Sequence, residues 1–361
     1  MPDGCIELVA VQSFMRVDDY HDGHAFCAKI AALTERVSAA RERDSSGAFR
    51  HPALVVFPEH IGTFLSIAGY ADLLRAGDDV EALLRRLVLR RPLRLASTML
   101  ACRTLSPAAA VLLGESAKMH RIYRGAFRDT ARRLAATVVA GSIVLPENAA
   151  GIDAEELRPR NNRLFNLSYT FAPDGRCVNV TKKVHLVPTQ EDTLPLTAGE
   201  AADLAPIESP CGRLGVMICY DGFAEPHTDR EPGFRALGPR LAAAGVEVIA
   251  QPSANSWPWN ERWVFCDAGE NQLRRDQWLN EGLFSQLRDM PGVRYAVNPH
   301  LIGEILGNRF DGRSYVFARG ADGEPRILAA ASADALDPSS EEVLVVRVPA
   351  VAPAQRAAVS R

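Results

Sequence analysis

The chain has 361 residues, of which 47% are hydrophobic and 24% charged, a composition that excludes disordered, collagen-like and coiled-coil proteins. Lys and Arg number 41 and Asp and Glu number 44, so the formal net charge is −3 and no global basic field draws the chain to nucleic acid. No nucleic-acid partner is expected, and any site for an anion must be local.

Nine short β-rich runs are predicted as strands, and several are apolar on both faces. They cover residues 6–12, 54–57, 137–144, 167–172, 214–218, 246–250, 293–297, 314–318 and 343–348. Between the first two, residues 26–37 carry an apolar stripe at helical spacing and should pack on a sheet. Residues 173–175 and 321–323 contain Asp-Gly between strand-like runs, which favours hairpins and therefore mixed sheets.

Residues 71–119 are predicted to form a helical, arginine-rich insertion. Its arginines include six that have no acidic residue among them: Arg85, Arg86, Arg90, Arg91, Arg94 and Arg103. Runs of charge usually face water, so a solvated helical excursion or an oligomer contact is favoured. A lid over the site, or a patch for an anionic substrate or a membrane surface, is the alternative.

The organisation of the chain favours one domain. No internal repeat or Gly/Ser-rich linker is evident, so residues 1–348 are predicted as a single domain and residues 349–361 as a loose tail. Seven scattered cysteines without a CxxC pair indicate a reducing compartment and no structural metal. Neither a signal peptide nor a membrane-spanning apolar run is apparent, so a cytoplasmic protein without stable membrane association is expected.

Three side chains at predicted strand ends could carry chemistry. Glu59 follows an apolar strand, Lys183 lies beside a second lysine on an extended segment, and Cys219 ends a buried-looking strand. Adjacent residues of a strand point to opposite faces, so one lysine can turn inward, where it must find a carboxylate. A thiol needs a nearby base or positive charge to act as a nucleophile. Taken singly, each residue is more often structural.

Taken together, the segments around these residues resemble the nitrilase superfamily of carbon–nitrogen hydrolases. The segments are FPE at 57–59, KKVHLVP at 182–188 and GVMICYD at 215–221, in the family's order. Weaker matches surround them over nearly the whole chain: Val11-Gln12, Gly141-Ser142, Asn166 with the Asp-Gly at 174–175, Pro252-Ser253, Asn298 and the F-x-G-x-S segment at 310–314.

The resemblance implies an α/β fold, namely a four-layer αββα sandwich of two mixed β-sheets, in homodimers or larger homo-oligomers and without a cofactor. Glu59 would be the general base, Lys183 the cation beside the oxyanion and Cys219 the nucleophile that forms a thioester. Glu191, eight residues after Lys183, has the spacing of the family's supporting glutamate. The backbone N–H of Tyr220 could complete an oxyanion hole. A base and an ammonium beside a thiol also make chemical sense independently.

Tyr220-Asp221 follow the cysteine where true nitrilases usually have Trp-Glu. The resemblance therefore implies an amidase or carbamoylase-like hydrolase of a linear amide or carbamoyl compound. Acyl transfer to an amine, nitrile hydrolysis and a non-catalytic binding protein of the same fold are the alternatives. His185, Trp257 and Asn298 are further candidates for substrate contacts, each against a structural role in the core or at an interface.

Overall fold

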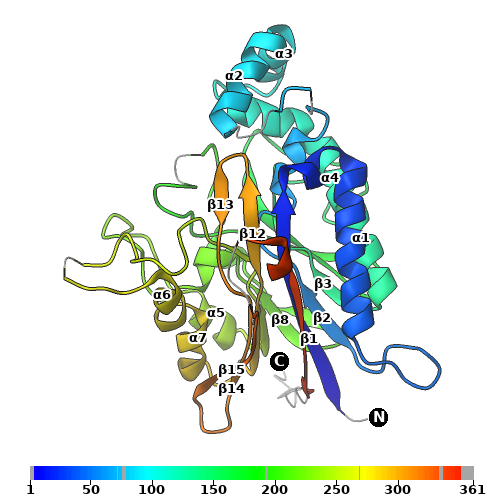
Figure 1. Cartoon of the computed structure of the whole chain (residues 1–361), viewed down its shortest axis with the longest axis vertical. Helices are drawn as coiled ribbons and strands as arrows, with labels where there is room; N and C mark the ends of the chain where they lie inside the picture. Colours follow the sequence, from blue (N-terminus) through cyan, green and yellow to red (C-terminus); the bar gives the residue numbers. More distant parts are fainter. Residues whose placement is uncertain are drawn as a thin grey trace, which may run out of the picture.

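A computed structural model describes residues 4–70, 72–74, 79–191, 194–267, 269–332 and 336–350. The larger of its two sheets is built around β1 (Cys5–Arg16) (Figure 1). Its strands follow the order β10 (Ser253–Ala254), β12 (His300–Ile305), β1, β2 (Ala53–Val56), β3 (Thr137–Val139), β5 (Phe165–Phe171) and β4 (Ile143–Leu145), with β13 (Asn308–Phe310), β16 (Glu342–Pro349) and β6 (Cys177–Lys182) paired to β12, β1 and β5. Parallel pairs such as β1–β2 and antiparallel pairs such as β5–β6 both occur, so this sheet is mixed.

The second sheet has six strands and is also mixed. Its order is β15 (Pro325–Ala330), β14 (Tyr315–Arg319), β11 (Tyr295–Asn298), β9 (Val248–Ala250), β8 (Gly212–Val216) and β7 (Ile207–Ser209). The central strands β8, β9 and β11 are parallel, whereas β14–β15 and β7–β8 are antiparallel. Both predicted Asp-Gly turns join antiparallel neighbours, β5 to β6 and β14 to β15, which confirms the two hairpins.

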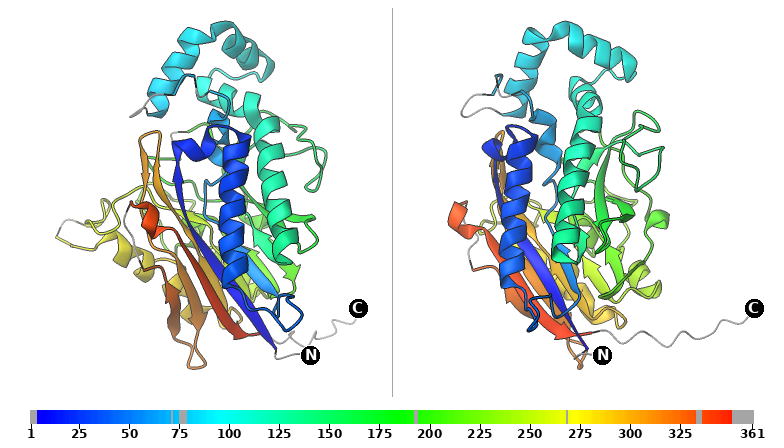
Figure 2. Two further views of the ribbon diagram at one scale, coloured as in Figure 1. Left: turned by 45° about the vertical axis from the view of Figure 1, so that its right-hand side comes forward. Right: turned by 90° about the vertical axis from the view of Figure 1, so that its right-hand side faces the viewer.

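Helices cover the outer face of each sheet. On the larger sheet α1 (Gly23–Ala40) and α4 (Pro107–Leu134) lie side by side (Figure 2). On the smaller sheet α5 (Gly238–Ala243), α6 (Arg274–Asn280) and α7 (Leu283–Gln286) form the cover. Short 3₁₀ turns complete the described elements: η1 (Val17–Tyr20), η2 (Thr63–Ile67), η3 (Ala201–Asp203), η4 (Cys219–Gly222), η5 (Leu287–Asp289) and η6 (Pro338–Ser340).

Three apolar cores separate these layers. One lies between α1, α4 and the larger sheet, a second between the two sheets, and a third between the smaller sheet and α6–α7. The stripe predicted for α1 is buried in the first core, and Asp22 caps that helix by accepting a hydrogen bond from Ala25 N (2.8 Å). Burial of β2 and β9 on both faces agrees with their continuous apolar sequences. The predicted αββα sandwich is confirmed.

The single strand predicted over residues 137–144 is wrong, because the chain breaks it at Gly141. Gly141 has φ +71°, in the left-handed region, and separates β3 from β4. A β-carbon there would lie 2.0 Å from the carbonyl oxygen of Pro58. Only glycine permits so close an approach to the segment that carries Glu59.

Replacing Gly141 with alanine is expected to lower the free energy of unfolding by more than about 1 kcal/mol, since the side chain adds backbone strain and forces Pro58 to move. Gly125→Ala is the matched control, because Gly125 lies within α4 and a β-carbon there has open space. That change should leave stability unaltered or raise it by up to about 1 kcal/mol. Urea unfolding of both variants measures the difference; equal effects would contradict the close-approach explanation.

The arginine-rich segment contains α2 (Val80–Arg90) and α3 (Pro92–Ala101), which project beyond the ends of the sheets (Figures 1 and 2). Acidic residues elsewhere in the same segment pair with several of its arginines, including Arg91 with Asp72 (3.1 Å) and Arg94 with Glu115 (2.9 Å). Four leucines are 74–95% exposed: Leu89, Leu93, Leu100 and Leu105. The predicted end of the insertion at residue 119 falls inside α4, which continues into the core. The role of the insertion and the single domain over residues 1–348 stay predictions.

Most of the predicted tail, residues 351–361, lies outside the described residues; β16 ends at Pro349. The seven cysteines are free thiols. None of the helices in the described ranges combines the length and hydrophobicity that crossing a membrane requires.

Candidate active site

Glu59 lies at the carboxyl end of β2, and its buried carboxylate accepts three hydrogen bonds. Oε1 accepts from Lys183 Nζ (2.8 Å) and from the amide of Asn166 (3.0 Å), while Oε2 accepts from the backbone N–H of Ala254 (3.1 Å). The apolar strand and Pro58 deliver the side chain to the end of the sheet, as the sequence predicts for a strand-end acid. The three donors hold the carboxylate in one orientation.

Lys183 follows directly after β6, and its backbone N–H donates to Asn166 O (2.9 Å), which extends the strand pairing by one residue. The two lysines diverge as predicted: Lys182 ion-pairs with Glu147 (2.8 Å) near the surface, while Lys183 is buried. Burial alone would lower the pKa of Lys183, but the carboxylates of Glu191 and Glu59 raise it well above its ordinary value. The side chain is therefore a fixed ammonium.

Glu191 is the second carboxylate on Lys183, which it contacts through Oε2. That oxygen also accepts from Val187 N (3.0 Å), and Oε1 accepts from the Asn166 amide (3.1 Å). Burial alone would raise the pKa of Glu191, but Lys183 and His60 lower it below its ordinary value. Lys183 and Asn166 thus both bridge the two carboxylates, and eight residues of spacing place Glu191 beside the ammonium.

Cys219 begins η4 with φ +51°, a left-handed conformation that is uncommon outside glycine. Its backbone N–H donates to Pro252 O (2.8 Å), and its carbonyl accepts from the side chain of Gln251 (2.8 Å). The thiol donates to Ala254 O (3.3 Å). Ala254 thereby contacts both groups, since its N–H holds Glu59 and its carbonyl holds Cys219.

The Cys219 thiol is protonated in this arrangement. Burial and the charge of Glu59 raise its pKa well above the ordinary value, although Lys183 acts in the opposite direction. The electrostatic interactions of the thiol with Glu59, Lys183 and Glu191 unite the four residues in one buried cluster. A thiol of this kind needs a base at the moment of attack, and a carboxylate is part of the cluster.

The loop after Cys219 is tied to the lysine segment by Asp221. Its buried carboxylate accepts from His185 N (2.8 Å), Val184 N (3.1 Å) and Ile218 N (3.2 Å). Burial raises the pKa of Asp221 to about 7 despite these donors. The N–H of Tyr220, beside Cys219, makes no hydrogen bond with any described residue. The predicted oxyanion hole stays a prediction.

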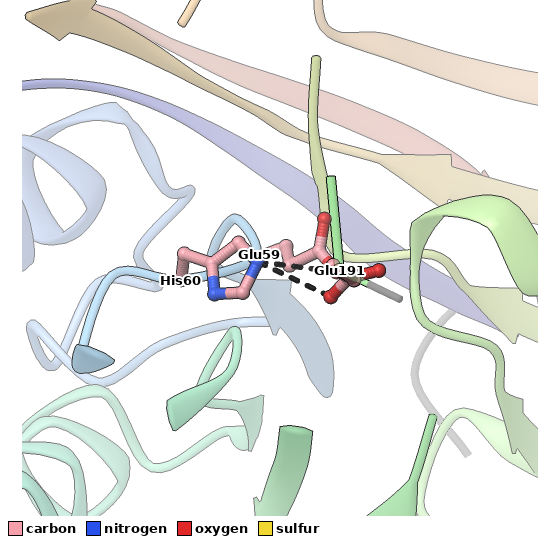
Figure 3. A group of neighbouring side chains, drawn as sticks. All are labelled: Glu59, His60 and Glu191. Atoms are coloured by element: carbon pink, nitrogen blue, oxygen red, sulfur yellow. Dashed lines mark ion pairs between the residues drawn. The ribbon is translucent and has the colours of Figure 1, made fainter. Parts of the chain in front are cut away.

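His60 joins the cluster without having been singled out from the sequence. Its Nε2 lies 3.5 Å from Glu191 Oε1 and 3.8 Å from Glu59 Oε1, and the three side chains converge in Figure 3. Together they offer three ligand atoms that could hold a metal ion. However, the ammonium of Lys183 already contacts both carboxylates, so the cluster contains its own cation.

Two of the candidates for substrate contact, Asn298 and His185, form hydrogen bonds with other residues of the protein. Asn298 donates to Gln251 O and Ser253 Oγ, both at 2.8 Å. His185 Nδ1 lies 3.2 Å from Asp221 Oδ1, its Nε2 accepts from Arg235 N (3.3 Å), and burial lowers its pKa to about 4. Both residues position neighbouring segments here, and their contact with substrate stays a prediction.

Trp257 lies at the start of an aromatic cluster that surrounds the buried Arg274. Its ring packs edge-on against Trp263 (5.0 Å) and contacts Phe265 (6.0 Å). The guanidinium of Arg274 lies over Trp263 (3.8 Å) and Trp257 (4.9 Å) and donates to Asn255 Oδ1 (2.9 Å). The loop after Pro252-Ser253 thus contributes rings beside the cysteine loop, whereas Arg274 had no motif that could identify it.

Four histidines in different parts of the fold are held neutral by burial. The pKa is lowered to about 3 for His300 and to about 4 for His120 and His185, and well below the ordinary value for His227. His300 packs between Trp259 and Trp278, and neither ring nitrogen has a hydrogen-bond partner among the described residues. Between pH 6.5 and these lowered values the unfolded chain binds more protons, so stability falls as the pH falls.

His300→Phe is therefore expected to reduce this acid sensitivity. Between pH 6 and 4.5 the wild type should lose about 2 kcal/mol more free energy of unfolding than the variant, because one fewer proton is taken up on unfolding. Urea unfolding of both proteins at each pH gives the difference. Parallel curves would mean that His300 does not titrate on unfolding as described.

Comparison with known proteins relates this site to one family. The profile of the family described as carbon–nitrogen hydrolase matches residues 37–225, a span that includes Glu59, Lys183, Glu191 and Cys219. A search of curated proteins finds no match.

Several solved structures have a fold similar to that of this chain. Nit3 of Saccharomyces cerevisiae, a member of branch 10 of the nitrilase superfamily, has a TM-score of 0.54 at 17% identity, over 96% of this chain and 90% of that chain. A carbon–nitrogen hydrolase from Helicobacter pylori G27 has 0.55 at 15% identity, over 96% and 90%. A double mutant of the amidase from Nesterenkonia sp. AN1, in complex with acrylamide, has 0.52 at 16% identity, over 96% and 91%.

Proposed function

Because the chain belongs to the carbon–nitrogen hydrolase family, within the nitrilase superfamily, we propose that it hydrolyses the C–N bond of a linear amide or carbamoyl compound through a thioester on Cys219. Glu59 is the general base, Lys183 the oxyanion cation and Glu191 the carboxylate that supports Lys183. No cofactor takes part in this chemistry.

One observation carries the proposal: the backbone of Ala254 joins acid and thiol beside a fixed ammonium. Ala254 N donates to Glu59 Oε2 (3.1 Å) and Ala254 O accepts from Cys219 Sγ (3.3 Å). Lys183 Nζ lies 2.8 Å from the other oxygen of Glu59. This arrangement supports a base, a nucleophile and a cation that act on one reacting carbonyl group, as thioester formation requires.

The first half-reaction transfers the acyl group to sulfur. The Cys219 thiol attacks the amide carbon while Glu59 takes its proton, and the carbonyl oxygen gains negative charge. Lys183 and the free N–H of Tyr220 stabilise that oxygen. Glu59 then gives the proton to the departing nitrogen, so the C–N bond breaks and ammonia or an amine leaves.

The second half-reaction returns the enzyme to its starting state. Water enters, Glu59 removes its proton, and the resulting hydroxide attacks the thioester carbon. The oxyanion again faces Lys183 and Tyr220 N–H. Collapse of this intermediate releases the carboxylic acid and the Cys219 sulfur, which recovers its proton from Glu59. The raised pKa of the resting thiol fits a base that works only during attack.

Tyr220-Asp221 after the cysteine favour an amide over a nitrile, and Asp221 has a defined task here. Its carboxylate gathers backbone N–H groups from both the lysine segment and the cysteine loop. The relative position of Lys183 and Cys219 therefore depends on it. We also propose that the protein forms a homo-oligomer and is located in the cytoplasm.

The test is product analysis on a mixed panel of linear amides, carbamoyl compounds and nitriles. Purified protein is incubated with the panel, and consumption, carboxylic acid and ammonia are followed by mass spectrometry and an ammonia assay. The expected result is conversion of at least one amide or carbamoyl compound to acid. Turnover only when an amine acceptor is added would instead indicate acyl transfer, and conversion of nitriles alone would exclude the amide assignment.

A further inference from the structure

Arg274 is a buried cation whose environment leaves its charge without a direct acidic partner. It is the first residue of α6 and is 3% exposed. Its guanidinium donates to the neutral side chains of Asn255 and Gln277. Among the described residues no carboxylate forms an ion pair with it. Glu281 is one step further away, on the amide nitrogen of Gln277 (2.6 Å).

Such a charge is costly to bury, because a guanidinium away from water normally needs a carboxylate. Burial lowers the pKa of Arg274 to about 9, although the group remains a cation at neutral pH. The rings of Trp263 and Trp257 offset part of the cost by cation–π contact. A role confined to packing would be served as well by an uncharged side chain.

The guanidinium also lies close to the proposed nucleophile. The guanidinium donates a hydrogen bond to Asn255, and Asn255 directly follows Ala254. The carbonyl of Ala254 accepts the hydrogen bond of the Cys219 thiol. The charge of Arg274 interacts electrostatically with the thiol of Cys219 and with Tyr220. Trp257, one of the predicted candidates for a substrate contact, forms part of its surroundings.

The net charge of the proposed catalytic residues also bears on the role of Arg274. Glu59, Glu191 and Lys183 together carry one net negative charge, so these three side chains by themselves would repel an anion. A separate cation beside the cysteine loop reverses that preference on its own side of the site.

We propose that Arg274 recognises a carboxylate of the substrate, so that the preferred amides or carbamoyl compounds are anionic. This deepens the proposed function and rests on it. The planar guanidinium suits a carboxylate, which it can bind through two parallel hydrogen bonds. The aromatic rings of Trp257 and Trp263 shield that pair from water.

A pair of thiol reagents tests the charge preference without knowledge of the substrate. The 2-sulfonatoethyl and 2-(trimethylammonium)ethyl methanethiosulfonates differ in charge and transfer groups of similar size to a thiol. Their reaction rates at Cys219 are followed by peptide mass spectrometry in wild type, Arg274→Gln, Arg274→Lys and Arg275→Gln. Arg275 is the matched control, because it is the next residue of α6 and lies at the surface, bonded to Asn260.

The sulfonate-to-ammonium rate ratio is expected to fall roughly tenfold or more in Arg274→Gln, to be largely retained in Arg274→Lys, and to be unchanged in Arg275→Gln. In the wild type the same ratio should exceed that of free 2-mercaptoethanol by about tenfold, a comparison that does not depend on any variant. A wild-type ratio at or below that of the free thiol, or an equal ratio in all variants, would overturn the inference.

A failure of the proposed function would look different. If Cys219 reacts with neither reagent in any of the proteins, the nucleophile itself is unavailable and both proposals fall. If it reacts with both at charge-independent rates, the thiol chemistry stands and only the carboxylate site is wrong. If Arg274→Gln lowers the thermal unfolding temperature but not the ratio, Arg274 has a structural role alone.

Turnover gives a second readout once amides are identified. The monoamide of a dicarboxylic acid is compared with its methyl ester, which has the same chain but no charge. Arg274→Gln should lower kcat/KM for the anionic amide by roughly tenfold or more relative to the ester, mainly through KM. Equal losses for both compounds would contradict recognition of the carboxylate.

Discussion

Cys219→Ala is expected to remove amide turnover, with kcat lowered roughly a thousandfold or more, because no other group can form the thioester. The fold should survive, since the change deletes one sulfur atom and keeps the backbone. Initial rates of ammonia release measure the effect, and circular dichroism with urea unfolding checks the fold.

The chain provides a matched control in Cys211. That cysteine is also buried, and burial raises its pKa to about 12, but it lies in the core between the two sheets. Cys211→Ala should leave turnover within about twofold of wild type. Residual activity of Cys219→Ala above a thousandth of wild type would refute the thioester mechanism.

Lys183→Met is expected to remove turnover and to destabilise the protein by about 3–5 kcal/mol, because it leaves two buried carboxylates without their cation. Glu59 and Glu191 are 1% and 5% exposed, so water cannot replace the ammonium. Urea unfolding at pH 7 gives the loss. Lys182→Met is the control: it breaks a more exposed pair with Glu147 and should cost less than about 1 kcal/mol.

The pH dependence of this variant has a defined sign. In the wild type the pKa of Glu191 is lowered, so its ion pair contributes stability at neutral pH that is lost as the pH falls below the ordinary carboxyl value. Without Lys183 the two carboxylates repel each other, and protonation of one of them removes this repulsion. The deficit of Lys183→Met should therefore shrink between pH 7 and pH 5.

A second substitution supplies the decisive comparison. Lys183→Met combined with Glu191→Gln removes one of the two stranded charges, so it should regain part of the lost stability while turnover stays absent. If the double variant is no more stable than Lys183→Met, the loss arises from packing and not from unpaired charge.

The site could be predicted from the sequence where short segments of defined conformation place one side chain each. An apolar strand ending in Pro-Glu delivers Glu59, and alternation along an extended segment turns Lys183 inward while Lys182 reaches the surface. Strands that are apolar on both faces and a helix with one apolar stripe predict a helix packed on a buried sheet, whereas the full αββα order follows from the family resemblance. The catalytic roles themselves remain predictions.

Other features depend on contacts between distant segments, which local patterns do not encode. The break at Gly141 arises from the approach of Pro58, 83 positions earlier in the chain. Asp221 and His60 carry no periodic signal, yet each contacts a segment far away in the sequence. Arg274 is a single arginine among many, and its burial among aromatic rings follows only from how α6 packs.

The link between acid and thiol through Ala254 has a consequence for how the site tolerates change. Both contacts use main-chain atoms, so replacing the side chain at position 254 deletes neither of them, and a scan of side chains would overlook the residue. What fixes these atoms is the pairing of β10 with β12, where Ala254 lies opposite Leu301. Substitutions at position 254 are therefore compatible with an unchanged site, provided that the register between the strands is kept.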